Sequence, residues 1–419
     1  MPLSPLLNRL ERLIKADIRY LIRGNFWLVA ARIISVGFGI LLSVAFANVL
    51  SPDTYGFYKY VLSIAGMTGA FSLTGLYTAL TNSIARGDLG TLRTTLWSSV
   101  RWSLLASAIT LAVAAYYAIH SNYALALSLL IVAVCSPVLS SAGNYRALFS
   151  GLPDFKAGAL WSIPRSVLPT AAMIAAVFVT QNPVIIVGVY FVSNVLTVIW
   201  LYRRAIWKWH VPATAESTLS TIRFARYNSV LSIFYQVASQ VDQFLVWHFV
   251  GAAGVAYYSF ATSPVEQILS FSGNFSALVT PKFAKKKTDA EVFASIPLRI
   301  KQMLFVVVPL TAAYILAAPF IFKYLFPKYV GVVVYSQLYS IILILQPLGF
   351  IDVALVARES RGIRNFFVLV GQLMKLLLLF VGVWKYGILG GVVALVISEI
   401  FNSVIGLGIL IYVRKRHLS

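Results

Sequence analysis

Residues 26–60, FWLVAARIISVGFGILLSVAFANVLSPDTYGFYKY, decide the class of fold. Positions 26–49 are mostly apolar, and Arg32 is their only charged residue. An α-helix needs about 20 such residues to cross the hydrocarbon core of a bilayer. The run ends at the short turn Leu50-Ser51-Pro52-Asp53, and a second apolar run follows from Phe57. The stretch therefore predicts two membrane-spanning helices joined by a tight connection.

The same alternation of apolar run and short connection continues along the chain. Of the 419 residues, 59% are hydrophobic and 11% are charged, and the mean hydropathy is +0.84. A soluble domain cannot bury so much apolar surface. The composition predicts an all-α membrane protein of about twelve transmembrane helices. The expected spans are 26–49, 57–80, 97–119, 123–145, 159–179, 183–202, 227–249, 256–280, 303–322, 332–355, 363–384 and 387–411.

The charges predict the orientation of these spans. Lys and Arg number 34 against 13 acidic residues, a formal net charge of +21. Most basic residues lie in every second connection and near the two ends, whereas the other connections are short and almost uncharged. Because cytoplasmic loops carry the excess of Lys and Arg, both termini are expected in the cytoplasm. The net charge is thus a topology signal, and we expect no nucleic-acid partner.

The longest polar break, near the middle of the chain, predicts two parallel six-helix lobes around a central cavity. The turn near residues 48–58 resembles that near 248–258, and each opens one half of the chain. The first 25 residues are basic and lack a cleavage site after a short apolar core, which indicates an uncleaved arm. The expected parts are a cytoplasmic amphipathic arm 1–25, an N-terminal lobe 26–202, a cytoplasmic linker 203–226, a C-terminal lobe 227–413 and a cytoplasmic tail 414–419.

Four motifs resemble those of bacterial polysaccharide and oligosaccharide flippases of the O-antigen type. These proteins belong to the multidrug/oligosaccharidyl-lipid/polysaccharide exporter superfamily. The resemblance covers most of the chain, although the C-terminal third is only generically similar. The motifs are LSPDTYGFY at 50–58; GLYTAL at 75–80 with IAR at 84–86; YRALFSGLPDFK at 145–156; and VDQF at 241–244, followed by Gly251 and Tyr257-Tyr258.

The resemblance implies a transporter, not an enzyme. It implies movement of a polyprenyl-pyrophosphate-linked oligosaccharide to the outer leaflet for cell-surface polysaccharide, such as O-antigen of lipopolysaccharide. Membrane lipids would surround the protein, and a polysaccharide polymerase and a chain-length regulator are implied partners. Two alternatives stay open: a multidrug or cation antiporter of the same superfamily, and a membrane glycosyltransferase or polymerase. The short outer connections speak against the second, which would need a sizeable extracytoplasmic loop.

Basic residues at the cytoplasmic side are the candidates for binding the pyrophosphate. Arg32 and Arg165 lie about six residues inside their spans, or roughly 9 Å deep, where a charge is costly. The forked guanidinium group suits phosphate oxygens. An alternative is that both side chains extend back to the interface. Arg86 and Arg146 complete the predicted inner rim, and Lys375, deeper in its span, is added to the substrate-binding set.

Three acidic residues in apolar runs are candidate ion-coupling residues. Asp242 and Glu266 have no obvious local partner, and burial favours the neutral form of a lone carboxylate. For Glu399, by contrast, the sequence suggests a local partner. The short turn at Lys385-Tyr386-Gly387 predicts that the last two helices are neighbours, so Glu399 could form an ion pair with Lys375.

Several chemistries lack a sequence signal. There is no glycine-rich phosphate loop followed by Lys and Ser or Thr, so no intrinsic ATPase is expected. Histidines are scattered, and Cys135 is the single cysteine. We therefore expect no cofactor and no metal site.

Overall fold

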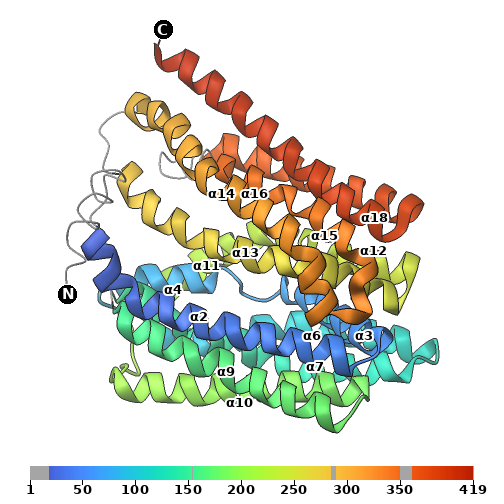
Figure 1. Cartoon of the computed structure of the whole chain (residues 1–419). Helices are drawn as coiled ribbons and strands as arrows, with labels where there is room; N and C mark the ends of the chain where they lie inside the picture. Colours follow the sequence, from blue (N-terminus) through green and yellow to red (C-terminus); the bar gives the residue numbers. More distant parts are fainter. Residues whose placement is uncertain (1–17, 153, 285–288, 350–360, 419) are drawn as a thin grey trace, which may run out of the picture. The chain divides into compact units, whose positions relative to one another are not determined.

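The computed structural model describes residues 18–152, 154–284, 289–349 and 361–418, and this part of the chain contains helices and no strand (Figure 1). The first half holds α2 Ile18–Val49, α3 Pro52–Gly69, α4 Leu76–Ala85, α5 Thr91–Thr94, α6 Leu96–Ile119, α7 Tyr123–Ala142, η1 Gly143–Arg146, α8 Ala147–Gly151, α9 Phe155–Val179 and α10 Pro183–Lys208. The second half holds α11 Thr218–Ala238, α12 Val241–Val250, α13 Ala252–Ala284, α14 Asp289–Leu325, η2 Pro327–Val332, α15 Val333–Tyr339, α16 Ile341–Leu345, η3 Gln346–Gly349 and α18 Arg361–Leu418.

Side-chain caps begin several of these helices where the sequence has short connections. Asn122 accepts a hydrogen bond from the backbone N–H of Leu125 at the start of α7. Asp154 does the same for Ala157 at the start of α9, and Asn182 precedes Pro183 at the start of α10. Asn and Asp satisfy N–H groups that a helix start leaves unpaired, and proline is suited to the first helical position. The caps therefore fix where each span begins.

Within the described residues, eight helices are long and apolar enough to cross a membrane, which supports a multi-pass membrane protein. One of them, Leu369–Gly408, covers most of both of the last predicted runs, because α18 turns at Gly387 with φ 57°. Glycine adopts this left-handed conformation without the strain of a side chain. Other predicted runs fall on broken helices, such as 57–80 on α3 and α4. The total of twelve spans stays a prediction.

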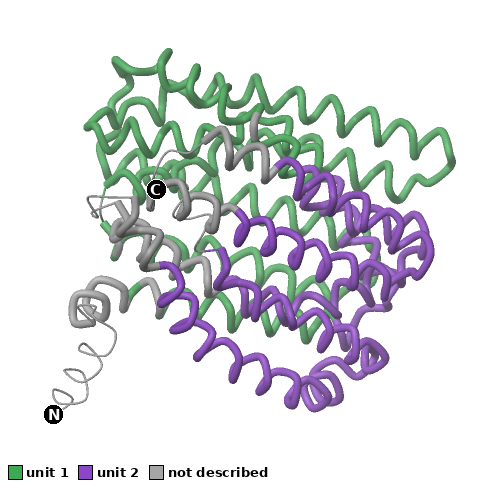
Figure 2. Tube along the Cα trace, turned by 90° about the horizontal axis from the view of Figure 1, so that it is seen from above, with its two compact units in different colours: residues 1–46, 65–236 green, residues 47–64, 237–419 purple. Residues whose placement is uncertain are grey.

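The chain divides into two compact units (Figure 2). Unit 1 consists of Met1–Phe46 and Ala65–Gln236, and unit 2 of Ala47–Ile64 and Val237–Ser419. The predicted lobes, 26–202 and 227–413, differ from these units in two segments: residues 47–64 belong to unit 2, and residues 227–236 belong to unit 1. Of the predicted arm 1–25, residues 1–17 lie outside the described part.

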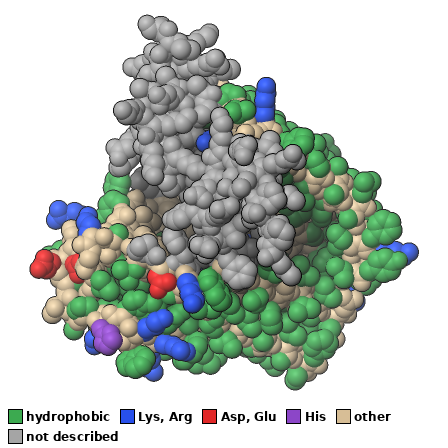
Figure 3. Space-filling view, turned by 60° about the vertical axis from the view of Figure 1, so that its left-hand side comes forward, with side chains coloured by type: hydrophobic (Ala, Val, Ile, Leu, Met, Phe, Trp, Pro, Cys, Tyr) green, Lys and Arg blue, Asp and Glu red, His purple; other side chains and the backbone are tan. Residues whose placement is uncertain are grey.

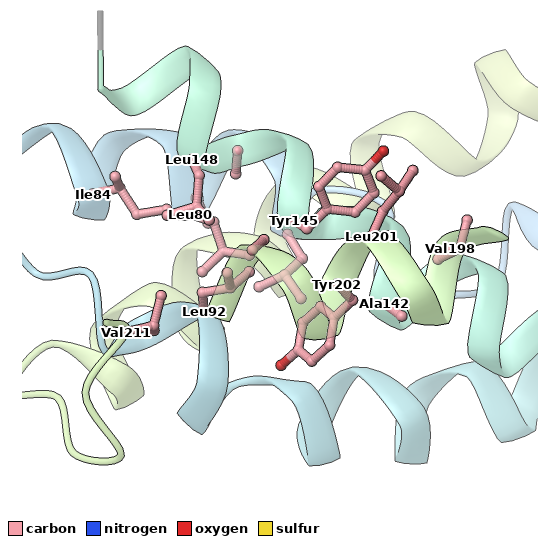
Figure 4. Packing of buried hydrophobic residues seen from close by; sticks show 14 of the residues in the cluster. Leu80, Ile84, Leu92, Ala142, Tyr145, Leu148, Val198, Leu201, Tyr202 and Val211 are labelled. Atoms are coloured by element: carbon pink, nitrogen blue, oxygen red, sulfur yellow. The ribbon is translucent and has the colours of Figure 1, made fainter. Parts of the chain in front are cut away.

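Unit 1 has an apolar core. It lies at the end of the spans where α4, α5 and α8 are found. Leu80, Leu92, Tyr145, Leu148 and Leu201 are among its buried members, drawn in Figure 4. They come from α4, α5, η1, α8 and α10, so short helices pack against the last turns of a long one. In a membrane protein such side chains stabilise the fold by close packing, through many small dispersion contacts, because lipid is as apolar as the core.

Hydroxyl groups join α6 to its neighbours in the same unit. Ser103 contacts Ser140 at 2.7 Å, Ser107 donates to the carbonyl of Ala133 at 2.7 Å, and Thr110 donates to Thr68 at 2.9 Å. Small residues let helix backbones approach closely in a membrane, and hydroxyl hydrogen bonds then add to the packing.

Aromatic packing explains why residues 47–64 belong to unit 2. Tyr60 stacks on Trp247 with ring centroids 4.2 Å apart, and Tyr55 packs on Phe260 at 4.8 Å. Between them, Gly56 lies so close to α13 that an added Cβ would be 1.8 Å from the carbonyl oxygen of Ala252. The YGFY part of the motif thus supplies ring contacts and one position at which only glycine fits.

Hydrogen bonds from a lysine to backbone carbonyls also attach residues 47–64 to unit 2. The ammonium group of Lys328 donates to the carbonyl oxygens of Asn48 and Leu50, at 2.8 and 3.0 Å. In return, the side-chain amide of Asn48 donates to the carbonyl of Leu325 at 3.0 Å. Carbonyl groups at the end of α2, which have no partner within the helix, are thereby satisfied.

The predicted linker 203–226 is helical at both ends, and hydrogen bonds to Asp88 hold the segment between its helices. α10 continues to Lys208 and α11 begins at Thr218. Between them, Ser217 donates from its backbone N–H and its hydroxyl to Oδ2 of Asp88, at 2.9 and 2.6 Å. Partial burial raises the pKa of Asp88, but these hydrogen bonds lower it, and the net pKa lies below the ordinary value.

Candidate functional site

Unit 2 brings together five charged side chains from four helices. We call them the acid–lysine cluster: Asp242 on α12, Glu266 on α13, Lys59 on α3, and Lys375 and Glu399 on α18. Electrostatic interactions connect Glu266 with Lys59, Asp242 and Lys375, and connect Glu399 with Lys375. All three predicted ion-coupling residues are therefore members of one cluster.

A helix break positions Asp242. α11 ends at Ala238, α12 begins at Val241, and Asp242 lies in the first turn of α12. A carboxylate there is favoured by the N-terminal end of the helix dipole. The hydroxyl of Tyr258, a residue only 1% exposed, donates to Oδ2 of Asp242 at 3.0 Å. The structure thus supplies the partner that was not evident from the sequence.

Glu266 combines protein partners with an accessible surface. Thr262, one turn earlier on α13, forms a hydrogen bond with its carboxylate. Lys59 and Lys375 supply positive charge from two other helices, while the side chain itself remains exposed. Glu266 therefore keeps accessible surface beside two positive charges, which favour the ionised form of its carboxylate.

Glu399 and Lys375 face each other across the last helical hairpin, as the sequence predicts. Their charges interact, but no ion pair joins them among the described residues; Asn402 instead forms a hydrogen bond with Glu399. Gly371 makes room for this amide, because a Cβ at Gly371 would lie 2.1 Å from Oδ1 of Asn402. The hairpin turn and a glycine together create this polar layer.

Buried tyrosines surround the cluster. Tyr55, Tyr258 and Tyr339 are each at most 6% exposed, and each interacts electrostatically with Glu266. Tyr339 also interacts with Asp242 and Glu399. Phenolic groups can donate hydrogen bonds to carboxylates and still pack as apolar rings. They give the acids a polar yet largely enclosed environment.

Two features of the cluster bear on its chemistry. With all groups ionised, three carboxylates and two ammonium groups give a net charge of −1, so one proton or one monovalent cation neutralises it. The described part of the chain contains no group of three or more His, Cys, Asp or Glu side chains that could hold a metal ion.

The predicted arginine set lies in unit 1, apart from Lys375, which belongs to unit 2. Arg165 on α9 donates from Nη1 to Oδ1 of Asn194 on α10 at 2.7 Å. Arg165 also interacts electrostatically with Tyr145, Arg146 and Tyr190. An amide oxygen holds the guanidinium without neutralising it, so its charge stays available to an anion.

Arg32 on α2 and Arg165 on α9 lie at similar positions along the axes of their helices. Ser35, one turn after Arg32 on α2, forms a 2.7 Å hydrogen bond with Ser166, which directly follows Arg165. The bond places the two arginines on neighbouring helices, within about one helical turn, or ~5 Å, of each other along the axes. Both side chains are half-buried.

Arg146 and Arg86 are arranged differently. Arg146, in η1, lies over the ring of Tyr77 with its guanidinium carbon 5.7 Å from the ring centroid. Arg86 follows the last residue of α4 and is exposed. The structure therefore brings Arg165 and Arg146 into one group with Arg32 nearby, and leaves Arg86 at the end of a helix.

Sequence reasoning missed Lys59, Asn194, Tyr258 and Asn402. Lys59 was not among the candidates, although its charge acts on Glu266 inside unit 2. A usable signal existed: Lys59 is one helical turn after Tyr55 in the motif at 50–58, so both side chains share a helix face. Asn194, Asn402 and Tyr258 gave no signal in the sequence, because the residues that they contact lie on other helices or on distant parts of the same helix.

Solved structures with the same fold are membrane transporters. An inward-facing multidrug resistance MATE family transporter of the MOP superfamily aligns with TM-score 0.66 and 13% identity, covering 92% of this chain and 98% of that one. An outward-facing one gives 0.62 and 15%, covering 94% and 95%. The lipid II flippase MurJ gives 0.63 and 15%, covering 92% and 87%. The chain is thus a multi-pass membrane protein with the MOP transporter fold.

The particular family follows from the sequence profile described as "Polysaccharide biosynthesis protein", which matches residues 21–287. The match extends over more than half of the chain, so the chain belongs to this family, as the motif resemblance predicts. Among curated proteins, none matches the chain in sequence.

Proposed function

We propose that this protein is a flippase for a polyprenyl-pyrophosphate-linked oligosaccharide, which it moves from the cytoplasmic to the outer leaflet of the inner membrane by alternating access. Family membership in polysaccharide biosynthesis is the observation that carries the proposal. The proposed role is in cell-surface polysaccharide such as O-antigen, with a polymerase and a chain-length regulator acting on the product. The protein itself makes and breaks no covalent bond.

The arginine group in unit 1 supports recognition of the pyrophosphate. The Arg165 guanidinium is positioned by Asn194, and Arg32 lies about one turn away on the next helix. Two arginines within about one helical turn of each other suit a diphosphate, whose oxygens accept charge-assisted hydrogen bonds. A polar path for the glycan also avoids stripping its hydroxyls of water, at several kcal/mol for each unpaired group.

The acid–lysine cluster in unit 2 supports ion coupling. Its net charge of −1 is neutralised by one proton. A proton binds to a single carboxylate oxygen, whereas Na⁺ needs several ligands at once, and the described residues contain no group of three or more His, Cys, Asp or Glu side chains that could hold a metal ion. The proposed coupling ion is therefore a proton, taken up at Glu266, the acid with accessible surface.

Deletion of the gene in a glycan-producing cell tests the proposal. Lipid-linked oligosaccharide should accumulate on the cytoplasmic side, and the intact gene should restore polymer export. A matched control is the Arg101→Gln variant, which loses one exposed cation of unit 1 outside the arginine group and should also restore export. Normal export in the deletion strain, with no precursor retained, would exclude the flippase role.

A multidrug or cation antiporter is the second candidate, because the fold likeness extends to MATE transporters. Measurements of drug tolerance and of lipid-linked sugars in the deletion strain distinguish the two functions. An antiporter deletion lowers drug tolerance and leaves lipid-linked sugars unchanged, whereas a flippase deletion does the reverse. A membrane glycosyltransferase or polymerase would instead leave precursors of altered length.

The orientation is tested by cysteine labelling in a Cys135→Ala background. Ser121→Cys, between α6 and α7, should react with an impermeant maleimide from outside the cell. Arg223→Cys, near the start of α11, should react only after the membrane is opened. The opposite result would invert the proposed topology.

A further inference from the structure

The last turns of α10 carry two cations that lie on a platform of indole rings. Arg204 contacts the rings of Trp161 and Trp200, with its guanidinium carbon 6.0 and 5.5 Å from their centroids. The ammonium group of Lys208 lies 5.7 Å from Trp161 and 4.6 Å from Trp209. We call these five residues the α10 platform.

The platform is rigid beneath its cations. Trp161 and Trp209 pack edge to face at 5.2 Å, and Phe149 contacts both rings at 5.5 and 5.3 Å. Trp161, from α9, is buried and belongs to the core of unit 1. The indoles therefore hold the cations in place by cation–π attraction, at little cost in side-chain freedom.

The cations remain exposed and lack a carboxylate partner. Arg204 and Lys208 both keep accessible surface, and neither forms an ion pair with any acid in the described ranges. From Phe155 to Ala215 the sequence has no Asp or Glu at all. The α10 platform thus presents positive charge without internal neutralisation.

The position of the platform is that of a membrane interface. α10 is a candidate span of mean hydropathy 2.3, and the platform occupies its final turns. Trp207, 78% exposed, projects from the same turns. Tryptophan gathers where hydrocarbon meets headgroups. Figure 3 shows one face of the molecule, on which Lys and Arg side chains lie among hydrophobic ones.

We infer that the α10 platform binds the phosphate of an anionic phospholipid in the leaflet at this end of α10, which the charge pattern predicts to be the cytoplasmic one. Arg204 and Lys208 donate hydrogen bonds to the phosphate oxygens. Trp200 and Trp207 contact the glycerol and upper acyl region. The inner leaflet supplies anionic headgroups, and each basic residue near it adds attraction. The site adjoins the proposed arginine group, since Trp161 lies one helical turn before Arg165 on α9, but it uses different cations.

The test measures stabilisation of the full-length protein in detergent by added lipid. Unfolding is followed with a thiol-reactive dye, because Cys135 is the single cysteine and is buried. Phosphatidylglycerol should raise the Tm of the wild type, and phosphatidylcholine should not. The Arg204→Gln/Lys208→Gln variant should need roughly 10-fold or more phosphatidylglycerol for half of the effect, from the attraction of two basic residues.

Controls separate the site from bulk charge and from the helix dipole. Arg101→Gln/Arg223→Gln removes two exposed cations of the same unit and should respond like the wild type. Loss of dipole stabilisation at the end of α10 lowers the Tm in every lipid equally and leaves the phosphatidylglycerol increment unchanged. Equal increments in the platform variant and the control variant would overturn the inference.

Two further experiments use the wild-type protein and therefore test the inference even if the platform variant does not fold. Native mass spectrometry of the wild type should retain phosphatidylglycerol in preference to phosphatidylcholine, and no preference would overturn the inference. Inorganic phosphate should not reproduce the Tm increment. An equal increment with phosphate would assign the platform to a soluble anion and reject the phospholipid.

Discussion

Oδ2 of Asp242 accepts a 3.0 Å hydrogen bond from the hydroxyl of Tyr258, sixteen positions later in the chain. The bond joins the first turn of α12 to α13, on either side of the tight turn at Gly251. Gly251 has φ 97° and ends α12. The hydrogen bond and this turn together fix the position of an acid within the acid–lysine cluster.

We expect Tyr258→Phe to destabilise the protein by roughly 1–3 kcal/mol, the cost of leaving a buried polar partner unsatisfied. Asp242→Asn removes the charge but keeps an acceptor. If the hydrogen bond is the shared cause, the double variant should lose less stability than the sum of the two single losses. Thermal unfolding in detergent measures all three. Strict additivity would mean that the two side chains act independently.

Removal of Lys59 should impair transport, because the cluster then carries a net charge of −2 with all acids ionised. Lys59→Met leaves Glu266 with less compensating charge. Lys59→Met/Glu399→Gln restores the net charge, keeps Glu266 in place, and should recover part of the transport rate in vesicles. Lys323→Met, at the exposed end of α14, is the matched control and should transport normally. No recovery in the double variant would contradict charge balance as the reason.

Coupling to protons makes a related prediction about Glu266. Glu266→Gln should lose the response of transport to an imposed pH gradient, and the wild type should respond to that gradient without sodium. Transport that needs sodium and ignores pH would reject the proposed coupling ion. Gln267→Glu, which adds an acid at the neighbouring exposed position, should not restore the response.

Substitution of Arg32 and Arg165 separates charge from geometry in the arginine group. The Arg32→Gln/Arg165→Gln variant should stop polymer export and leave lipid-linked precursor inside the cell. Lysine at both positions should retain partial export, because it keeps the charge and loses the fork. Full export by the Gln variant, at equal protein level, would reject pyrophosphate capture but not the flippase function.

The docked linker should be sensitive to acid. Because the pKa of Asp88 lies below its ordinary value of 3.8, its ionised form contributes stability above that value, and the contribution is lost as the pH falls through the lower pKa. Limited proteolysis after residue 208 should therefore increase at low pH. Asp88→Asn should show raised cleavage already at neutral pH, with little further change on acidification. Identical cleavage of the variant and the wild type would contradict this role of Asp88.

Gly56 should tolerate no side chain. Gly56→Ala places a Cβ against the carbonyl of Ala252, and overpacking of this kind typically costs about 1–3 kcal/mol or more. Gly39→Ala is the control, since no heavy atom lies within 4 Å of its added Cβ. Tm values in detergent should fall only for the first variant.

The sequence was sufficient for the elements and the family because both depend on local information. Apolar runs such as 183–202 must be helical in lipid, since every backbone polar group there needs an internal partner. The caps at Asn122 and Asn182 were visible as short polar connections. The motif at 50–58 identified the family, and the predicted neighbourhood of Lys375 and Glu399 followed from one short turn.

Tertiary structure decided what depends on contacts between distant segments. The sequence placed residues 47–64 with the first lobe, but stacking of Tyr60 on Trp247 and capping by Lys328 place them in unit 2. The same segment carries Lys59 to Glu266, while Asn194 holds Arg165. Hydropathy records whether a residue prefers lipid to water; it carries no information on which helix a buried polar side chain will meet. The sequence by itself therefore determined the membrane-spanning helices and the family, and only packing determined the partners of the charges.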